Sequence, residues 1–386
     1  MIDDVSTAVA RAIKEGSSKL DPAASTCVVV PDATRPLPFE ATLRPVLEYL
    51  DVGDQPTIVL VALGLHRPMT TDELAPIERA CRNLDIHVVQ HDPHGDLVDF
   101  GTTGDIPIQL NRRIVEADQV ICIGTVEPHQ YAGYSGGIKA ASIGCASAPT
   151  ISAMHGLTFL RDEQTALGRV ADNPFQQALW RIGAPLGNIL GLQLVPAIGG
   201  GIESLFFGDI DEAFTQAQKV AEASFFESFD TAFDWLHLSV PAVKASNFYQ
   251  ASRAATYVAL IDRPAIRRGG TIVVDAACPE GMGDGEGERA CASAIARGED
   301  ALLRELHTPS NKQIRGGQQR AYVLARACDR NRIALVGAPK IDVLDALGID
   351  QFDTVDEAID ALDLHEKRGC RIDDVFHRIP RLASEG

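Results

Sequence analysis

Short apolar runs, many of them β-branched, alternate along the chain with longer amphipathic stretches. In the first third of the chain the runs occupy 25–32, 56–64, 85–92 and 117–125. Near-continuous apolar runs of this length are typical of parallel strands that are covered on both faces. The stretches at 39–51 and 70–84 have the apolar spacing of helices. This pattern predicts an α/β fold with mainly parallel sheets covered by helices.

The second half of the chain repeats this alternation. Apolar runs occupy 233–241, 269–278 and 331–339, and helical patterns occupy 209–225, 296–307 and 355–366. A chain of 386 residues is longer than one core usually serves. We therefore expect two domains with an active-site cleft between them. The expected limits are an N-terminal cofactor-binding domain at 1–229, a C-terminal α/β domain at 230–372, and a tail at 373–386 that packs back on the first domain.

Composition narrows the class of protein. Lys and Arg number 35 against 53 Asp and Glu, a net charge of -18, which argues against nucleic-acid binding. The eight cysteines are scattered, as expected of free thiols in a reducing compartment. The start of the chain, 1–16, is an acidic amphipathic pattern rather than a signal peptide. No apolar run approaches the roughly 20 residues of a membrane span. We expect a cytoplasmic protein.

Chemically active side chains follow the first two predicted strands directly. In α/β sheets, ligands bind where strands end. Asp32, Thr34 and Arg35 follow the first strand. Aspartate binds ribose hydroxyls or caps a helix, and arginine grips phosphate or carboxylate, so a ligand site and a capped turn both stay open. His66 follows the second strand, where an imidazole is suited to proton transfer near neutral pH.

The third strand is followed by a histidine cluster. His87, His91 and His94 lie near Asp92 and Asp96, which raises the question of a metal site. Their spacing fits no metal-binding template, and we expect a polar loop instead.

A glycine-rich turn follows the fourth strand. The sequence "GYSGGIKAASIG" at 133–144 is typical of a turn that offers backbone N–H groups to an anion, with Lys139 as a nearby cation. The expected donors are Ser135, Gly136 and Gly137. The order of residues is not that of a Walker motif. His129 precedes this turn and His155 follows it.

A fifth candidate segment lies in the second half. Tyr249, Gln250 and Arg253 occur within "KASNFYQASRAA" at 244–255, and Gln250 and Arg253 share a face of a helix at this spacing. A substrate-binding face and a solvated helix face both stay open.

Together these segments resemble the nickel-pincer lactate racemase family of 2-hydroxyacid racemases and epimerases. The resemblance is carried in the family's order by "DATRP" at 32–36, "GLHRP" at 64–68, "PHQYAGYSGGIKAASIG" at 128–144, "MHG" at 154–156 and "YQASR" at 249–253. It covers most of the chain.

The resemblance implies a cofactor, a metal and roles for the site residues. The cofactor would be nickel held in a pyridinium-3,5-bisthiocarboxylic acid mononucleotide, covalently linked through Lys139, with His155 as the protein ligand to nickel. Soft sulfur donors with imidazole suit nickel. His66 and His129 would be the acid/base pair. The implied binding groups are Asp32, Thr34, Ser135, Gly136 and Gly137 for the cofactor, and Arg35, Tyr249, Gln250 and Arg253 for the substrate.

The implied reaction is racemisation of a 2-hydroxy acid by hydride transfer through a 2-keto acid. The α-carbon C–H beside a carboxylate is too weakly acidic for simple deprotonation. The family's lactate racemase has lysine where this chain has Arg253, and its cleft tryptophan has no counterpart in "RGGQQRAYVLAR". We expect the substrate to be lactate or another short-chain 2-hydroxy acid such as malate, because these two differences change the substrate pocket.

Other functions remain open. A sugar-acid 2-epimerase would use the same cofactor, and a nucleotide- or nickel-cofactor-binding protein would need no catalysis. A NAD-dependent dehydrogenase is disfavoured, because no G-x-G-x-x-G follows the first strand. The expected partners are the small-molecule substrate and the enzymes that make the cofactor, with no nucleic acid and no membrane.

Overall fold

The computed structural model describes residues 1–35, 37–50, 56–308 and 314–383, and within these the chain forms two compact units. Unit 1 comprises 1–128, 134–154 and 175–223, and unit 2 comprises 129–133, 155–174 and 224–386. Pro36 of the first motif, Asp51 of the first predicted helix and 384–386 of the predicted tail lie outside the described residues. The domain limits expected from the sequence stay a prediction.

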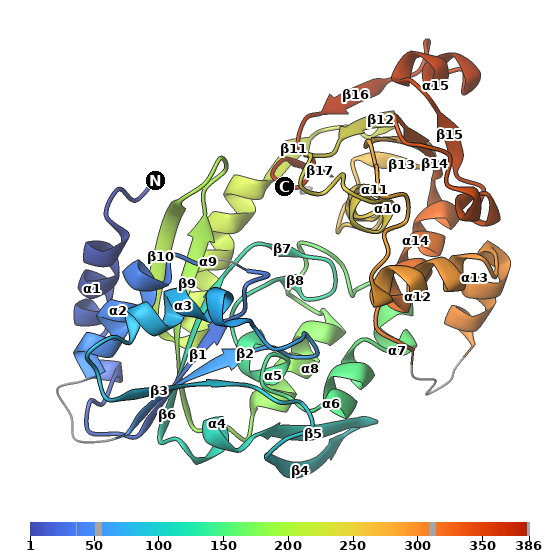
Figure 1. Cartoon of the computed structure of the whole chain (residues 1–386). Helices are drawn as coiled ribbons and strands as arrows, with labels where there is room; N and C mark the ends of the chain where they lie inside the picture. The colour runs from blue at the N-terminus through green and yellow to red at the C-terminus, as the bar shows by residue number, and fades with distance from the viewer. Residues whose placement is uncertain (36, 51–55, 309–313, 384–386) are drawn as a thin grey trace. The chain divides into compact units, whose positions relative to one another are not determined.

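Unit 1 is built on a six-stranded sheet in the order β10-β9-β6-β1-β2-β3 (Figure 1). All neighbours are parallel except β9 and β10. In register, Val28 lies opposite Val59 on one side and Ile121 on the other. The strands are β1 (Thr26–Pro31), β2 (Thr57–Ala62), β3 (Ile86–Gln90), β6 (Gln119–Thr125), β9 (Asn188–Pro196) and β10 (Ile202–Asp209). The four strands predicted in the first third of the chain are confirmed.

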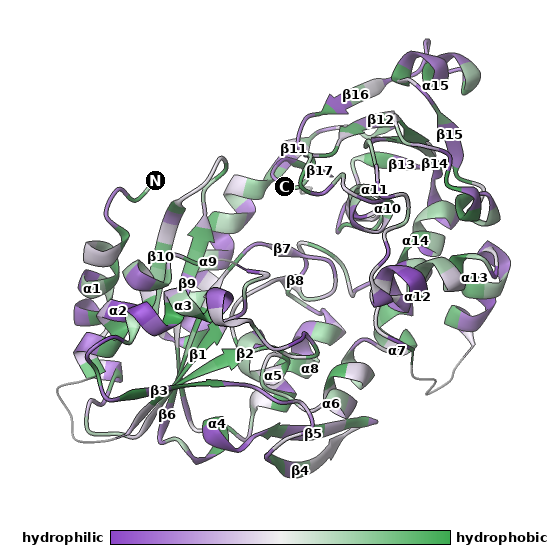
Figure 2. Ribbon diagram, in the orientation of Figure 1, coloured by the Kyte–Doolittle hydropathy of each residue, from purple (hydrophilic) through white to green (hydrophobic). Residues whose placement is uncertain are grey.

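Helices cover both faces of this sheet because its strands are apolar on both faces. Val28 and Val30 join one core with α1 (Val5–Glu15), α2 (Phe39–Leu50) and α3 (Thr71–Ala80). Cys27 and Val29 alternate with them and point to the other face. There α5 (Lys139–Ser142) packs against β1 and β6. Figure 2 shows the central strands as hydrophobic segments beneath helices of mixed polarity.

The order of strands in unit 1 reverses beside β1. The chain passes from β1 to β2 and β3 on one side, and then returns to β6 on the other. Ligands of such sheets bind outside the carboxyl ends of the strands at this reversal. The segments that begin at Asp32 and Val126 therefore meet where a site is expected.

Unit 2 contains an all-parallel sheet in the order β15-β14-β13-β12-β16. Its strands are β12 (Phe233–Ser239), β13 (Ile266–Asp275), β14 (Arg332–Val336), β15 (Asp350–Phe352) and β16 (Gly369–Ile372). The three strands predicted in the second half are confirmed. The strand order reverses at β12, whose carboxyl end leads to α10 (Phe248–Ala251) and α11 (Arg253–Ala259).

The larger remaining helices are α8 (Pro174–Gly183), α9 (Ile210–Phe225), α12 (Glu286–Ile295), α13 (Glu299–His307), α14 (Gln318–Arg330) and α15 (Val355–Ala361). Shorter elements are η1 (Ser17–Lys19), β4 (Leu97–Thr103), β5 (Ile106–Asn111), α4 (Arg112–Glu116), β7 (Pro128–His129), β8 (Gly133–Tyr134), α6 (Ala148–Met154), α7 (Leu157–Arg161), β11 (Phe226–Phe229), η2 (Asp342–Leu347) and β17 (Ile379–Leu382).

Several elements were not foreseen. The β4–β5 hairpin and the antiparallel β9–β10 pair were absent from the sequence prediction. β17 pairs with β11 in parallel. The helix expected at 244–255 forms as α10 and α11, separated by Ser252, which keeps helical dihedral angles. Within the described ranges, no helix combines the length and the apolar character needed to cross a bilayer.

We predict that Leu47→Ala lowers the free energy of unfolding by about 2–5 kcal/mol, because Leu47 is fully buried between α2 and the sheet. Ile198→Ala is the control, since Ile198 is 47% exposed and should contribute less than about 0.5 kcal/mol. Urea unfolding followed by circular dichroism measures both. Equal effects at the two positions would contradict the packing of α2.

Candidate active site

The carboxyl end of β1 places Asp32 at the strand-order reversal of unit 1. Its side chain is buried, and Oδ1 accepts hydrogen bonds from the backbone N–H of Thr34 at 3.1 Å and from its hydroxyl at 2.6 Å. Oδ2 lies 2.6 Å from Nδ1 of His66. Burial raises the pKa of Asp32, but the hydrogen bonds from His66 and Thr34 outweigh it and hold the pKa below its usual value. Asp32 is therefore an anion at neutral pH.

His66 follows β2 and is oriented by this carboxylate. Gly64 before it has φ of +56°, and its N–H bonds the carbonyl of Gly144, so the turn bends back toward the sheet. A carboxylate at Nδ1 fixes the ring proton on that nitrogen. Nε2 then carries the lone pair, and the ring is 59% exposed. His66 is set up to accept a proton at Nε2.

Arg35 and Glu127 connect the ends of β1 and β6. Nη1 of Arg35 lies 3.2 Å from Oε1 of Glu127, and both side chains are partly exposed. The pair brings the two segments together at the reversal point. A partly exposed ion pair of this kind contributes little to stability.

The glycine-rich turn of unit 1 is held closed by its own contacts. The hydroxyl of Ser135 donates to the carbonyl of Thr125 at 2.9 Å, and its N–H donates to that of Glu127 at 2.8 Å. The N–H of Gly137 donates to Oε1 of the buried Gln193 at 2.7 Å. Two of the expected anion donors, Ser135 and Gly137, thus have protein partners already.

The glycines of this turn are needed for its backbone shape. Gly136 has φ of +83°, and a Cβ there would lie 2.6 Å from Val126. Gly137 has φ of +56°, with Phe214 3.0 Å from the position of a Cβ. The turn therefore runs close against its neighbours and directs the chain into α5, which begins with Lys139.

Lys139 is the one lysine that the sequence placed in the site, and its environment is unusual. Burial and the positive charge of Arg35 lower the pKa of its amine to about 7, against the opposing effect of Glu127 and Asp32. An ordinary lysine is almost fully protonated at neutral pH. A substantial fraction of Lys139 is instead the neutral amine, the form that is nucleophilic.

His129, Tyr131 and His155 gather in unit 2. The Tyr131 ring makes edge contacts with both imidazoles, with centroids 5.9 Å from His129 and 5.9 Å from His155. Nδ1 of His129 accepts from the backbone N–H groups of Tyr131 at 3.3 Å and Ala132 at 3.1 Å. That nitrogen is therefore unprotonated, and the ring proton of neutral His129 is on Nε2. His129 has the opposite tautomer to His66.

The predicted substrate residues of unit 2 follow β12. Asn247 caps α10 by accepting from the N–H of Gln250 at 3.0 Å, and Arg253 begins α11. The guanidinium of Arg320, in α14, lies 5.3 Å from the centroid of the Tyr249 ring. The sequence does not single out Arg320, because its neighbours in the chain are those of an ordinary helical arginine.

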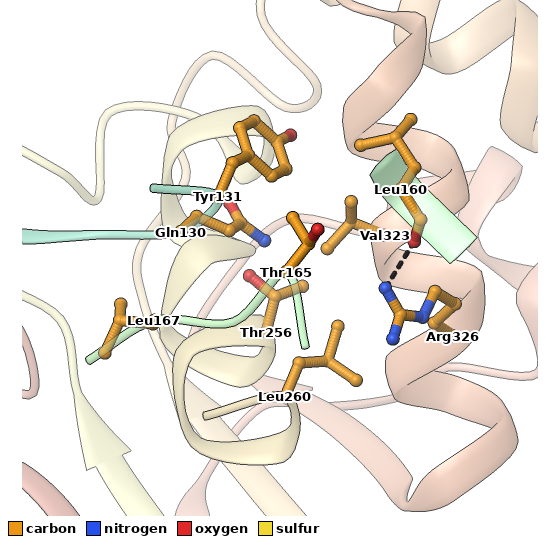
Figure 3. Close-up of a pocket in the computed structure, with 9 residues that line it drawn as sticks. All are labelled: Gln130, Tyr131, Leu160, Thr165, Leu167, Thr256, Leu260, Val323 and Arg326. Carbon is orange, nitrogen blue, oxygen red and sulfur yellow. Dashed lines mark hydrogen bonds between the residues drawn. The ribbon is translucent and has the colours of Figure 1, made fainter. Parts of the chain in front are cut away.

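A small cavity of about 10 Å³ lies beside Tyr131 within unit 2 (Figure 3). Gln130 and Thr165 line it together with Val323 and Arg326 of α14. Nε2 of Gln130 and Oγ1 of Thr165 are buried and lack partners among the described residues. A cavity of this size accommodates about one water molecule. It backs the segment that carries His129 and is too small for a substrate.

The histidine cluster after β3 is structural. His91 is buried, with Nε2 2.9 Å from the carbonyl of Ala146 and Nδ1 3.1 Å from Nδ2 of Asn111. Burial lowers the pKa of His91, so the ring is neutral. His87 and His94 are exposed. The described part of the chain contains no group of three or more His, Cys, Asp or Glu side chains able to hold a metal.

Comparisons with known proteins agree with this architecture. Residues 3–168 match the family model of the lactate racemase N-terminal domain. A protein named lactate racemase from Lactiplantibacillus plantarum is 26% identical over 383 residues, covering 92% of this chain and 85% of the relative. Another, from Thermoanaerobacterium thermosaccharolyticum, is 24% identical over 315 residues, covering 80% of this chain and 72% of the relative.

Solved structures show the same fold. The lactate racemase apoprotein from T. thermosaccharolyticum superposes with a TM-score of 0.85 at 21% identity, over 98% of this chain and 93% of that one. A Thermotoga maritima protein from a structural genomics programme has a TM-score of 0.66 at 16% identity, over 97% of each chain. The chain thus shares its α/β fold with a solved lactate racemase apoprotein. Over residues 3–168 it resembles the lactate racemase N-terminal domain family.

We predict that Lys139→Met stabilises the cofactor-free protein, and that the gain depends on pH. Because the pKa of Lys139 is about 7 in the folded protein, against 10.5 for an ordinary lysine, folding opposes protonation of this amine between these values. The wild-type protein therefore gains stability as pH rises through this window, and that gain is absent from the variant. The difference in unfolding free energy should be largest below pH 7 and shrink toward pH 10.5.

Lys219→Met on the exposed surface of α9 is the matched control and should change the free energy of unfolding by less than about 0.5 kcal/mol. Urea titrations at the two ends of the pH window make the comparison. A Lys139→Met difference that stays constant with pH would contradict the lowered pKa.

Proposed function

We propose that the protein racemises a 2-hydroxy acid with a nickel-pincer nucleotide, pyridinium-3,5-bisthiocarboxylic acid mononucleotide, as cofactor. The relatives named lactate racemase support the class of reaction. The observation that supports the chemistry is the pair of histidines in opposite tautomers. His66 has its lone pair on Nε2, and His129 has its proton there. Inversion at a hydroxyl-bearing carbon needs one group that accepts a proton and another that donates one.

The residues of the chain fit this cofactor. Lys139 supplies an amine that is partly neutral at pH 7, which is what a thioamide link to the cofactor requires. His155 supplies a single imidazole beside Tyr131, which is sufficient where carbon and sulfur donors of the cofactor provide the other nickel ligands. The turn that leads into Lys139 needs Gly136 and Gly137, because Cβ atoms there would meet Val126 and Phe214. When bound, the cofactor supplies reversible removal of hydride from the substrate's α-carbon, which leaves a planar 2-keto acid.

The two histidines move the hydroxyl proton. Nε2 of His66 accepts it from one enantiomer, and the anionic Asp32 at Nδ1 stabilises the imidazolium that forms. The proton for the oxygen of the opposite enantiomer comes from His129 as the imidazolium, so that proton loss leaves a neutral ring. In the reverse reaction neutral His129 accepts the proton and the imidazolium of His66 donates one. Asp32 acts as a positioning residue, in addition to any contact with the cofactor's ribose, and Thr34 keeps its carboxylate in place.

The proposed substrate groups are Arg35, Tyr249, Gln250 and Arg253, which hold the carboxylate and the hydroxyl. The substrate is lactate or another short-chain 2-hydroxy acid such as malate, and the second candidate is 2-epimerisation of a sugar acid. The enzymes that make the cofactor are the proposed partners. All eight cysteines are free thiols, which supports a reducing, cytoplasmic setting.

The covalent cofactor is tested by intact mass and nickel content of protein produced together with the cofactor-making enzymes. We expect added mass of the size of one nucleotide and about one nickel per chain, both absent in Lys139→Ala. The control Lys219→Ala, on the exposed face of α9, should keep both. An unmodified wild-type chain beside a fully modified positive-control racemase would overturn the proposed cofactor.

The acid/base roles are tested by His66→Gln and His129→Gln in loaded protein. Each should keep the cofactor mass and lower racemisation by about 10²–10⁴-fold, the usual contribution of a general acid or base. His365→Gln is the control, because His365 is exposed and pairs only with Asp360 among the described residues. Loss of optical rotation of a pure enantiomer measures the rate. Full activity in either site variant would remove that histidine from the mechanism.

A further inference from the structure

Unit 2 contains two arginines, Arg253 and Arg320, that form no ion pair with any described residue. Arg253 and Arg320 both have Nε buried without a hydrogen-bond partner. In the described ranges, neither guanidinium forms an ion pair with a carboxylate. Buried arginines normally pair with an acid, because an uncompensated charge away from water is costly. Here a buried arginine, Arg320, and a partly buried one, Arg253, occur in one neighbourhood.

Arg320 is the more constrained of the two. Its side chain is 7% exposed, lies over the Tyr249 ring at 5.3 Å and donates from Nη1 to Oε1 of Gln130 at 3.2 Å. It lies in the first turn of α14, whose start at Gly317 has no side-chain cap and no acidic residue. The positive end of the helix dipole disfavours a cation at that position. The Tyr249 ring and Gln130 offset part of this cost, and a bound anion would offset more of it.

The positive charge of Arg320 acts on Arg253. Burial lowers the pKa of Arg253, and the positive charge of Arg320 lowers it further. Tyr131, Tyr249 and Tyr257 act on it in the opposite direction. The two guanidiniums and the phenol groups thus form one cluster, which we call the arginine pair: Arg253 and Arg320.

The surrounding acids do not neutralise the arginine pair. Burial raises the pKa of Tyr131 to about 12, so this phenol is neutral at physiological pH. Burial likewise raises the pKa of Cys291, which Arg320 influences, to about 12. Glu288 of α12 acts on Cys291 as well but forms no ion pair with Arg320 in the described structure. Among the described residues no carboxylate pairs with either guanidinium, so a bound anion would supply the missing negative charge.

We propose that Arg320 selects substrates with a second carboxylate, so that the enzyme acts on a 2-hydroxy dicarboxylate of the malate type. Arg253 holds the carboxylate beside the reacting carbon, and Arg320 takes the one at the other end. This assignment rests on the proposed racemase function. A monocarboxylate such as lactate would leave one buried guanidinium unpaired, whereas a dianion neutralises both. The planar fork of arginine suits a carboxylate at each end.

Gln130 links this selection to the reacting centre. Its Oε1 is bonded to Arg320, and it directly follows His129 in the chain. Its other end, Nε2, faces the small cavity in Figure 3. Arg320 thus bonds the residue that directly follows the proposed acid/base histidine, His129.

The test compares racemisation of malate and of lactate by the cofactor-loaded enzyme. The wild-type enzyme should prefer malate, and Arg320→Met should lower kcat/KM for malate by about 100-fold, mainly through KM, with lactate changed by less than about threefold. Arg330→Met is the matched control, because Arg330 lies at the other end of α14 and pairs with Glu163. It should leave both substrates unchanged. Arg320→Lys, which keeps the charge, serves if the methionine variant does not fold.

The outcomes separate this inference from the proposed function. Racemisation of lactate with little turnover of malate, or an equal loss for both acids in Arg320→Met, overturns the dicarboxylate assignment and leaves the racemase. Loaded enzyme that turns over no 2-hydroxy acid overturns the racemase. In that case calorimetry with malate decides the anion site: binding by wild type and Arg330→Met but not by Arg320→Met supports it, and binding by all three or by none overturns it.

Discussion

The site of unit 1 depends on one carboxylate at the end of the central strand. Asp32 is buried where the strand order reverses. Its Oδ1 accepts a hydrogen bond from Thr34, and its Oδ2 lies beside Nδ1 of His66. A buried carboxylate is tolerated only when such hydrogen bonds replace water. The same bonds fix the tautomer and the direction of the His66 ring. The stability of the fold and the chemistry of the site are thus coupled, because the buried carboxylate of Asp32, which needs hydrogen bonds, is also the group that orients His66.

A second consequence concerns the cations around Asp32. Arg35 lies near Lys139 and pushes the amine toward its neutral form, while Asp32 and Glu127 partly oppose this. If Asp32 were neutral, the amine would be still less basic. The charge on the carboxylate therefore keeps Lys139 close to the range where it titrates. One small set of charges controls both the proton acceptor and the nucleophilic amine.

The fold was largely predictable from the sequence, and the contacts of the site were not. The seven apolar runs were sufficient because buried parallel strands need continuous apolar side chains. β10 escaped because an antiparallel edge strand, partly polar as in 202–209, lacks that signal, whereas β9 has an apolar run and was overlooked. The residue types of the site could be named from local motifs, including His66 after β2 and Lys139 after the glycine turn. The Asp32–His66 bond, 34 residues apart, could not.

Contacts of this kind have no local signature. Gln193 receives the N–H of Gly137 from 56 residues away, and nothing around Gln193 in the sequence marks it. Tyr131 lies inside a motif, yet only the structure shows that it touches both His129 and His155. Arg320 reads as an ordinary helical arginine until its burial and its missing counterion are seen. Pairing is a property of the fold, and a residue's sequence neighbours do not encode it.

Because the net charge of the chain is -18, the local positive charges of Arg253 and Arg320 matter for binding an anion. A strongly acidic protein repels anionic ligands at long range, so an anionic substrate must be attracted by local positive charge. In unit 2 that charge comes from Arg253 and Arg320, near Tyr131, whose phenol is neutral because burial raises its pKa to about 12. One arginine is sufficient to bind one carboxylate. The second arginine therefore indicates a second anionic group on the ligand. The position of Arg320 in the first turn of α14 has a cost without a ligand, and a protein that retains such a cost is expected to recover it on binding.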